Sequence, residues 1–301
     1  MISKSEVSSI YAGLDDVVGA FRTHQLDHIE FPYVYLDATY LHVRNQTSQV
    51  TSMAVVVATG ITANGDREIL GCDIGDSEAE TFWRGFLRSL KARGLAGVQL
   101  VISDQHAGLV AALRRSFQGA VHQRCRVHFA GNLLALVPRS HTNMVAAVFR
   151  TIFAQPDAEA VAATSDQARE QLSSRFPKIG PLMDGAKTEV LAFTAFPRAH
   201  WQKIWSTNPL ERIHKEIKRR SRVVGIFPNE AAVIRLVGAC SPTCTTNGKP
   251  ATAATSPKAP WRGSTPSAIL TTSPNSTAAT DTEDQPRNPT TQRGAARPDR
   301  W

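Results

Sequence analysis

Residues 34–43, VYLDATYLHV, place a carboxylate in the middle of an apolar run. Tyr, Val, Leu and Thr favour a β-strand, and nothing in this run caps or starts a helix. A carboxylate on a buried strand loses solvation, so Asp37 needs a cation, a hydrogen-bond network or a metal ion beside it. The chain must therefore fold so that a partner for Asp37 reaches the middle of a sheet.

Two acids farther along the chain are candidates to share that partner. Asp104 ends a second apolar strand, and Glu211 lies near the start of a helix. Three carboxylates on a rigid scaffold are ligands that Mg²⁺ or Mn²⁺ prefers, and two such ions can clamp the attacking and leaving oxygens of a phosphodiester. Each acid also has an ordinary explanation: Asp37 could cap a turn or pair with an arginine, Asp104 could cap a helix, and Glu211 could be a first-turn acid.

The first part of the chain is expected to be a helix followed by a β-meander. Apolar residues recur at helical spacing over residues 2–24, which predicts an amphipathic helix. From residue 32 to 73 the pattern changes to short apolar runs of period two, and Asn64-Gly65 is a tight-turn signal between the second and third runs. Three antiparallel strands, led by the strand of Asp37, are therefore expected.

Helices and strands then alternate. Ser77 is the expected N-cap of a helix over residues 77–93, and Gly94 is its expected stop. A strand that ends at Asp104, a helix from residue 107 and a short strand near residues 119–123 follow. The pattern predicts an α/β domain with a mixed sheet, and the order of its elements is that of a ribonuclease H-like fold.

An all-α insertion is expected over residues 125 to about 205, because helical spacing recurs there and prolines punctuate it. The last helix is expected from about Thr207 to Arg220, with Thr207 or Asn208 as its cap and Glu211 just inside. Its predicted core stripe consists of Leu210, Ile213 and Ile217.

The composition changes abruptly after Gly238. Residues 239–301 contain no Val, Phe, Met or Tyr and are rich in Thr, Pro, Ala and Ser. Such a segment cannot bury enough apolar area to offset its chain entropy, so a disordered tail is expected. A frameshift in the coding sequence explains the sharp break, and a natural low-complexity tail is the alternative. The expected organisation is a residual helix at 1–28, a catalytic domain at 29–238 and this tail.

The charge balance of the chain points to a polyanionic partner. A formal net charge of +8 and a pI near 9.6 favour nucleic acid over a membrane surface, because no basic amphipathic anchor is evident. The sequence has neither a long apolar run nor a charged-then-apolar leader. Four cysteines, unevenly placed, do not make a disulfide framework, so we expect a reducing cytoplasm.

Several residues near the acids have both a functional and a structural interpretation. Cys125 and His128 form a C-x-x-H pair, which cannot complete a tetrahedral zinc site alone, and a buried thiol near a helix start is the commoner case. His106 could orient the acid at Asp104, contact DNA, or simply begin a helix. Trp201 and Trp205 could stack on a displaced base, although burial in the core is the favoured interpretation.

A basic run follows Glu211 on the last helix. An exposed, solvated helix face is the ordinary explanation, but a catalytic acid at the head of the same helix favours contacts to the phosphates of a DNA backbone. These contacts would confer affinity rather than sequence choice. The candidate residues are Arg212, Lys215, Lys218, Arg219, Arg220 and Arg222.

Three segments closely resemble the Mutator-type transposases of bacterial insertion sequences, and the resemblance runs from about residue 2 to Gly238. They are VISDQHAGLVAAL, HQRCRVHFAGNLLALVP and WSTNPLERIHKEIKRRSRVVGIFPNEAAVIRLVGA. The resemblance implies a ribonuclease H-like fold with an α-helical insertion before the last acid. It also implies a catalytic, metal-binding triad of Asp37, Asp104 and Glu211, with the C-x-x-H pair in a structural or site-shaping role.

The resemblance implies metal-dependent cleavage and strand transfer of double-stranded DNA at terminal inverted repeats and target sites, by a homo-oligomer in the bacterial cytoplasm, at the nucleoid. Members usually carry a longer N-terminal region and continue past residue 238 with more helix, so this chain is expected to be a truncated, degraded copy. A non-catalytic DNA-binding or dimerising remnant is the first alternative, and a host ribonuclease H-like nuclease is the second.

Overall fold

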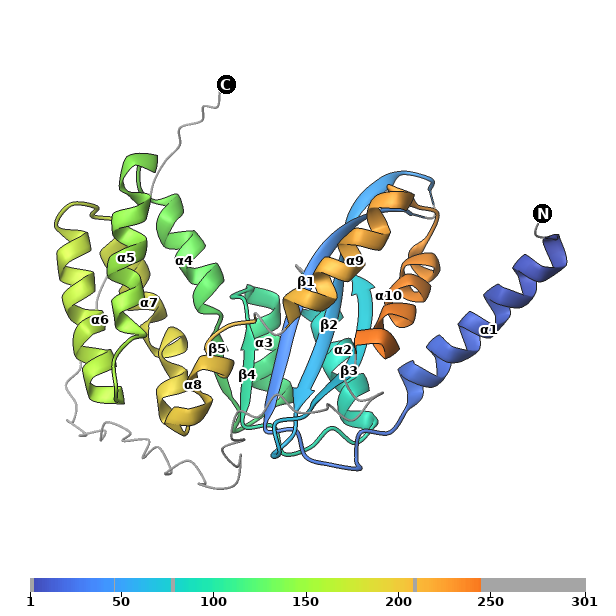
Figure 1. Cartoon of the computed structure of the whole chain (residues 1–301), viewed down its shortest axis with the longest axis horizontal. Helices are drawn as coiled ribbons and strands as arrows, with labels where there is room; N and C mark the ends of the chain where they lie inside the picture. The colour runs from blue at the N-terminus through green and yellow to red at the C-terminus, as the bar shows by residue number, and fades with distance from the viewer. Residues whose placement is uncertain (1–2, 46, 77–78, 208–209, 245–301) are drawn as a thin grey trace, which may run out of the picture. The chain divides into compact units, whose positions relative to one another are not determined.

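The computed structural model describes residues 3–45, 47–76, 79–207 and 210–244. These residues form a mixed α/β structure around a six-stranded sheet, with helices on both of its faces (Figure 1). Five strands follow the order β3-β2-β1-β4-β5, and β6 pairs with β1. The strands are β1 (Tyr33–Arg44), β2 (Val50–Ile61), β3 (Arg67–Gly75), β4 (Leu100–Ser103), β5 (Val121–Arg124) and β6 (Ile226–Phe227).

The predicted meander and mixed sheet are confirmed. Strands β1, β2 and β3 are antiparallel neighbours, and the turn between β2 and β3 contains Gly65 at φ 85°, a conformation that glycine adopts without steric cost. Strand β4 is parallel to both β1 and β5. The sheet thus changes from antiparallel to parallel pairing at the strand that carries Asp37.

The two faces of the sheet pack against different helices. On one face, Val34 and Leu36 of β1 belong to an apolar core with α2 (Glu80–Ala92) and α3 (Ala107–Ser116). On the other face, Tyr33 and Tyr35 belong to a core that includes α9 (Glu211–Val224) and α10 (Glu230–Cys244). Because side chains alternate along a strand, Asp37 lies on the same face as the two tyrosines.

The chain between β5 and α9 contains only helices among its regular elements: α4 (Arg126–Ala135), α5 (Thr142–Ile152), α6 (Ala158–Ser173), α7 (Ile179–Val190), α8 (Trp201–Ile204) and three short 3₁₀ turns. Trp201 and Trp205 are 3% and 8% exposed and contact the ring of Phe193. The interpretation of both tryptophans as core residues is therefore confirmed.

Buried polar side chains join these helices to the sheet. The amide nitrogen of Gln123, on β5, donates to the carbonyl of Val190 at 2.8 Å, and its amide oxygen accepts from the N–H of Phe193 at 2.7 Å. On β1, the hydroxyl of Tyr35 donates to the carbonyl of Lys203 at 3.0 Å. Backbone groups near helix ends, which lack a partner within the helix, are satisfied in this way.

Two predicted helix starts differ from the structure. Leu210, not Thr207, is the N-cap residue of α9; Thr207 is buried, and its N–H donates to Sγ of Cys125 at 3.3 Å. The Thr207 hydroxyl, which is the group that would cap the helix, donates to the same sulfur atom at 3.5 Å. Helix α2 begins at Glu80 with Ala79 as its N-cap residue. Ser77 and Asn208, the other expected caps, lie outside the described residues.

Helix α1 (Lys4–Thr23) packs against α10, where a Cβ atom at Gly238 would lie only 2.6 Å from Val18. Helix α10 continues to Cys244, beyond the point at which the composition changes, and Cys240 is fully buried. The rest of the predicted tail, residues 245–301, lies outside the described part of the chain. None of the described helices is long and apolar enough to cross a membrane.

Gln123→Leu should destabilise the protein by roughly 3 kcal/mol, because it leaves the buried Phe193 N–H and Val190 carbonyl without partners. Urea unfolding measures the free energy. Gln171→Leu, at an exposed position on α6, is the matched control and should change the value by less than about 0.5 kcal/mol. A loss below about 1 kcal/mol for Gln123→Leu would mean that water or a shifted backbone replaces the amide.

Candidate active site

Two of the three predicted acids lie side by side. The parallel pairing of β1 with β4 ends at Tyr35 and Ile102; Asp37 lies two residues farther along β1, and Asp104 directly follows the last residue of β4. Adjacent strands are about 4.8 Å apart, so this register brings the two acids to neighbouring positions. Both acids line one pocket of about 230 Å³, together with His106 and His128.

Each of these carboxylates has one oxygen bonded locally and the other directed at a histidine. Oδ1 of Asp37 accepts from the N–H of Ala38 at 2.9 Å, and Oδ1 of Asp104 accepts from the N–H of Gln105 at 2.7 Å. Oδ2 of Asp37 lies 3.3 Å from Nδ1 of His214, and Oδ2 of Asp104 lies 4.0 Å from Nδ1 of His128.

The C-x-x-H pair places a positive charge beside the acids. Cys125 precedes α4, and His128 lies in its first turn. Burial raises the pKa of the Cys125 thiol, but hydrogen bonds from His128 and Thr207 outweigh it, so the pKa lies below its usual value. The hydrogen bond with Cys125 raises the pKa of His128 to about 9, against the effect of burial, and the charges of Cys125, Asp104 and Asp37 add to the increase. The His128 ring is therefore largely an imidazolium at neutral pH.

His106 is the N-cap residue of α3, and its side chain lines the pocket of the two acids. It is therefore both a helix-start residue and a residue of the candidate site. Trp83, from α2, lines the same pocket.

The third predicted acid is not part of this pocket. Glu211 is the first residue of α9, its side chain is 53% exposed, and its Oε2 pairs with Nζ of Lys215 at 2.8 Å. Among the residues that the structure describes, no group of three or more His, Cys, Asp or Glu side chains lies close enough together to hold a metal ion. In this structure Glu211 therefore lies apart from the two aspartates, and the triad stays a prediction.

His214 is the residue that the sequence analysis missed. It lies three positions after Glu211, on the same helical face, and both its side chain and that of Asp37 are largely buried, at 12% and 15% exposed. The helical spacing from Glu211 was the available signal. This signal was weak, because a histidine between buried Ile213 and exposed Lys215 is common at the edge of the apolar face of an amphipathic helix.

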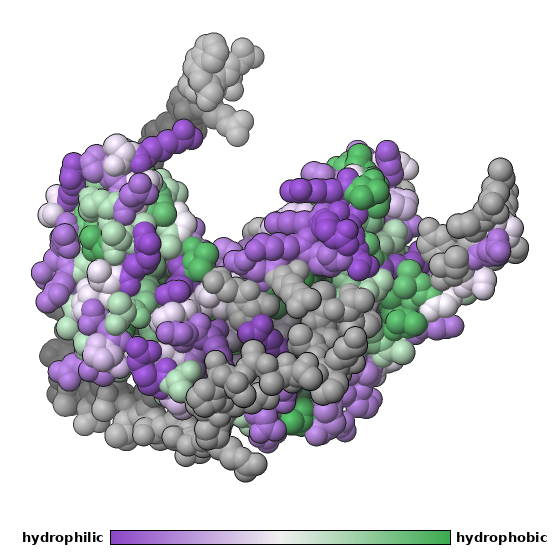
Figure 2. All heavy atoms as spheres, viewed as in Figure 1, coloured by the Kyte–Doolittle hydropathy of each residue, from purple (hydrophilic) through white to green (hydrophobic). Residues whose placement is uncertain are grey.

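The basic face of α9 is strongly hydrophilic, and Figure 2 shows hydrophilic side chains gathered over this helix. Arg219 and Arg220 both pair with Glu216, and these hydrogen bonds lower the pKa of Glu216 to about 2. Lys218 and Arg222 are exposed, and neither forms an ion pair among the described residues. The side chain of Arg212 is outside the described part of the structure.

Comparison with known proteins gives a consistent family. The transposase for insertion sequence element IS1081 of Mycobacterium tuberculosis is 46% identical over 238 residues, which cover 79% of this chain and 57% of that protein. The transposase for IS406 of Burkholderia multivorans is 42% identical over 239 residues, covering 79% and 61% of the two chains. The transposase for IS256 in transposon Tn4001 of Staphylococcus aureus is 34% identical over 244 residues, with the same two coverages.

The chain therefore spans about three fifths of the length of these relatives. A family model described as Transposase, Mutator family matches residues 1–247, which include every described element and both acids of the pocket. The chain belongs to the Mutator family of transposases.

Proposed function

We propose that this chain is the catalytic core of a DNA transposase that cleaves and joins DNA strands with divalent metal ions held by Asp37, Asp104 and Glu211. The observation that carries the proposal is that Asp37 and Asp104 line one pocket, where the parallel pairing of β1 with β4 ends. The relatives are named as transposases of insertion sequences, which supports DNA as the substrate.

A ribonuclease H-like fold is part of this proposal. Three antiparallel strands followed by two parallel strands, joined through helices α2 and α3, support it. So does the position of α9, which returns to the sheet after a long helical stretch and reaches Asp37 through His214. We interpret that stretch as the insertion before the last catalytic acid.

The donor set fits Mg²⁺ or Mn²⁺ in its chemistry. Asp37 and Asp104 present carboxylate oxygens to one pocket, and hard oxygen ligands are what these ions prefer. Glu211 would complete the set by exchanging Lys215 for the metal, which an exposed first-turn side chain can do by rotamer change. Two bound ions would supply charge stabilisation for the attacking and leaving oxygens of the phosphodiester.

The protein's own groups prepare this pocket. Two adjacent carboxylates repel each other, and the imidazolium of His128 offsets part of that repulsion at Asp104. His214 holds Oδ2 of Asp37 and links it to the helix that carries Glu211, so we assign His214 as a positioning residue. His106 lies at the same pocket, where it can contact the acid or the DNA.

The DNA would lie along the basic face of α9. Lys218 and Arg222 are exposed and free to contact phosphates, whereas Arg219 and Arg220 would first exchange Glu216 for the backbone. Recognition of terminal inverted repeats, assembly of a homo-oligomer on them and action at the bacterial nucleoid belong to the same proposal.

A non-catalytic remnant is the second candidate, and one observation favours it. Glu211 pairs with Lys215 instead of joining the two aspartates. A frameshift after about residue 238 would account for the composition of the segment that follows and for a degraded activity. Such a remnant would still bind DNA through α9 but would not cleave it.

Asp104→Asn should abolish Mg²⁺- or Mn²⁺-dependent nicking of DNA that carries the element's inverted repeats, by at least about a hundredfold, because a metal-ion contribution is worth several kcal/mol. Gel separation of nicked and intact DNA measures the loss. Asp16→Asn, at an exposed position on α1, is the matched control.

The same assay separates the candidates. A folded wild-type protein that binds DNA but does not nick it would favour the remnant. Equal nicking of DNA without inverted repeats would indicate a nuclease.

His214→Ala should weaken Mn²⁺ binding by about 10- to 100-fold, which is typical when the partner of a metal-binding carboxylate is removed. Paramagnetic resonance of free Mn²⁺ gives the dissociation constant, independently of activity. His42→Ala, at an exposed site on β1, should leave binding unchanged. An unchanged constant in a folded His214→Ala protein would argue that His214 only packs against the sheet.

Cys125→Ser should lower the pKa of His128 from about 9 towards 6.5, because it removes the hydrogen bond with the thiol, which is the largest cause of the increase. An NMR titration of the His128 ring measures this change. Cys72→Ser, at a buried thiol on β3, is the control. A pKa that stays near 9 in Cys125→Ser would assign the increase to Asp104 and Asp37 instead.

A further inference from the structure

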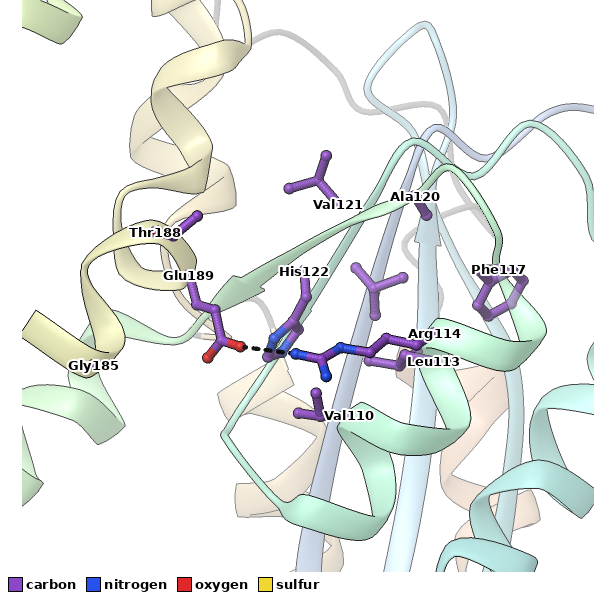
Figure 3. A pocket seen from close by; sticks show the side chains of 11 residues that line it. Val110, Leu113, Arg114, Phe117, Ala120, Val121, His122, Gly185, Thr188 and Glu189 are labelled. Carbon is purple, nitrogen blue, oxygen red and sulfur yellow. Dashed lines mark ion pairs between the residues drawn. The ribbon is translucent and has the colours of Figure 1, made fainter. Parts of the chain in front are cut away.

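A second cavity lies on the other side of α3 from the acid pocket. Leu109 lines the acid pocket, whereas the next residue, Val110, lines this cavity of about 370 Å³ between α3, β5 and α7 (Figure 3). Its walls are mostly apolar, with Leu113, Phe117 and Val121 among them. Nothing in the proposed cleavage reaction uses it.

Polar groups gather at one end of the cavity. Figure 3 shows the side chains of His122 and Arg114 directed toward Glu189, and NH2 of Arg114 lies 4.0 Å from Oε1 of Glu189. The Arg114 side chain is 77% exposed, so it reaches solvent at the mouth, whereas that of Glu189 is 21% exposed. The cavity thus has an apolar body, a half-buried acid and a cation at its entrance.

The hydrogen bonds of His122 define its tautomer. The hydroxyl of Ser103 donates to the carbonyl of Asp104 at 2.9 Å, so its oxygen accepts from Nε2 of His122 at 2.8 Å. Burial, with the charges of Arg124 and Arg114, lowers the pKa of His122 to about 4, so the ring is neutral at physiological pH. With the proton on Nε2, Nδ1 is an acceptor.

Two acceptors are left without donors. Nδ1 of His122 and Oε2 of Glu189 are both buried, and neither has a hydrogen-bond partner in the described part of the chain. A buried acceptor without a donor is costly, so a ligand that supplies donors at both points would be favoured. The apolar walls favour a ligand whose remaining surface makes apolar contacts.

We propose that this cavity binds a guanine base. Guanine is planar and carries two adjacent donors, its ring N–H and its amino group, on one edge, which matches two neighbouring acceptors of which one is a carboxylate. Arg114 has five donors and can pair with Glu189 and still contact the phosphate of the same nucleotide at the mouth.

The ligand can come from two sources with the same chemistry. One is a free guanine nucleotide, and the other is an unpaired guanine extruded from a DNA strand, which rests on the proposed function. In either case the occupant of the cavity would be linked through His122 and Ser103 to the backbone of Asp104. Binding in this cavity would therefore affect the position of the backbone at Asp104.

Binding of GMP, measured by calorimetry, tests the site without DNA or metal. We expect GMP to bind at least about tenfold more tightly than AMP, because AMP lacks a ring N–H on that edge, and IMP, which lacks the amino group, to lie between them. Glu189→Gln should remove the preference for GMP. Equal binding of all three nucleotides, or none by the folded protein, would overturn the proposal.

A cavity-filling variant controls for folding. Gly185 lines the cavity from α7, and a Cβ atom there meets nothing within 4 Å, so Gly185→Leu should fill the space and abolish GMP binding without changing a polar group. Gly131→Leu, on α4, where a Cβ atom also meets nothing within 4 Å, is the matched control. Thermal melting of both variants verifies that they are folded. GMP binding that survives Gly185→Leu would place the nucleotide elsewhere and contradict the proposal.

Duplexes with one bulged guanine or one bulged adenine distinguish the sources, with fluorescence anisotropy as the readout. A preference for the guanine bulge that GMP competes away supports the extruded base, and GMP binding without that preference supports the free nucleotide. A wild-type protein that binds GMP but fails to nick DNA would contradict only the proposed function, and one that nicks DNA but does not bind GMP would contradict only the nucleotide site.

Discussion

The structure depends on bringing two carboxylates into one pocket, where the parallel pairing of β1 with β4 ends. The register of β1 with β4 makes Asp37 and Asp104 neighbours, and like charges so close need compensation. Each acid receives one backbone N–H on Oδ1 and faces one histidine with Oδ2. The histidines come from α4 and α9, so both helices must return to this edge of the sheet.

Cys125 connects the start of α4 to the segment that leads into α9. Its thiol accepts from the N–H of Thr207, just before α9, and its hydrogen bond with His128 raises the pKa of that ring. The N–H of Arg126 donates to the carbonyl of Trp205 at 3.0 Å, which fastens the same two segments again. One buried thiol therefore raises the pKa of the histidine beside Asp104 and also holds the segment that leads into α9. The C-x-x-H pair thus has both a structural role and a role in shaping the site.

Helix α3 contributes residues to two pockets that favour different ligands. The carboxylates of the acid pocket favour binding of cations. The unpaired acceptors of the cavity beyond α3 favour a ligand with N–H donors. Ser103 joins them, since it bonds to His122 on one side and to the backbone of Asp104 on the other. The parallel pairing of β4 with β5 is sufficient for this connection, because it brings Ser103, Asp104 and His122 within hydrogen-bonding distance.

Local pattern was enough to predict the meander, the strand that ends at Asp104, the core stripe of α9 and the burial of both tryptophans, because period and turn chemistry act over a few residues. The candidate acids followed from a charge on a buried strand together with the family resemblance. Only the tertiary structure decided that His214 holds Asp37, that Thr207 bonds a thiol instead of capping a helix, and that Glu211 pairs with Lys215. The first two contacts join residues that are far apart in the sequence, so no local pattern could predict them. The third selects one of several possible partners of Glu211, and which partners lie within reach is set only by the folded structure.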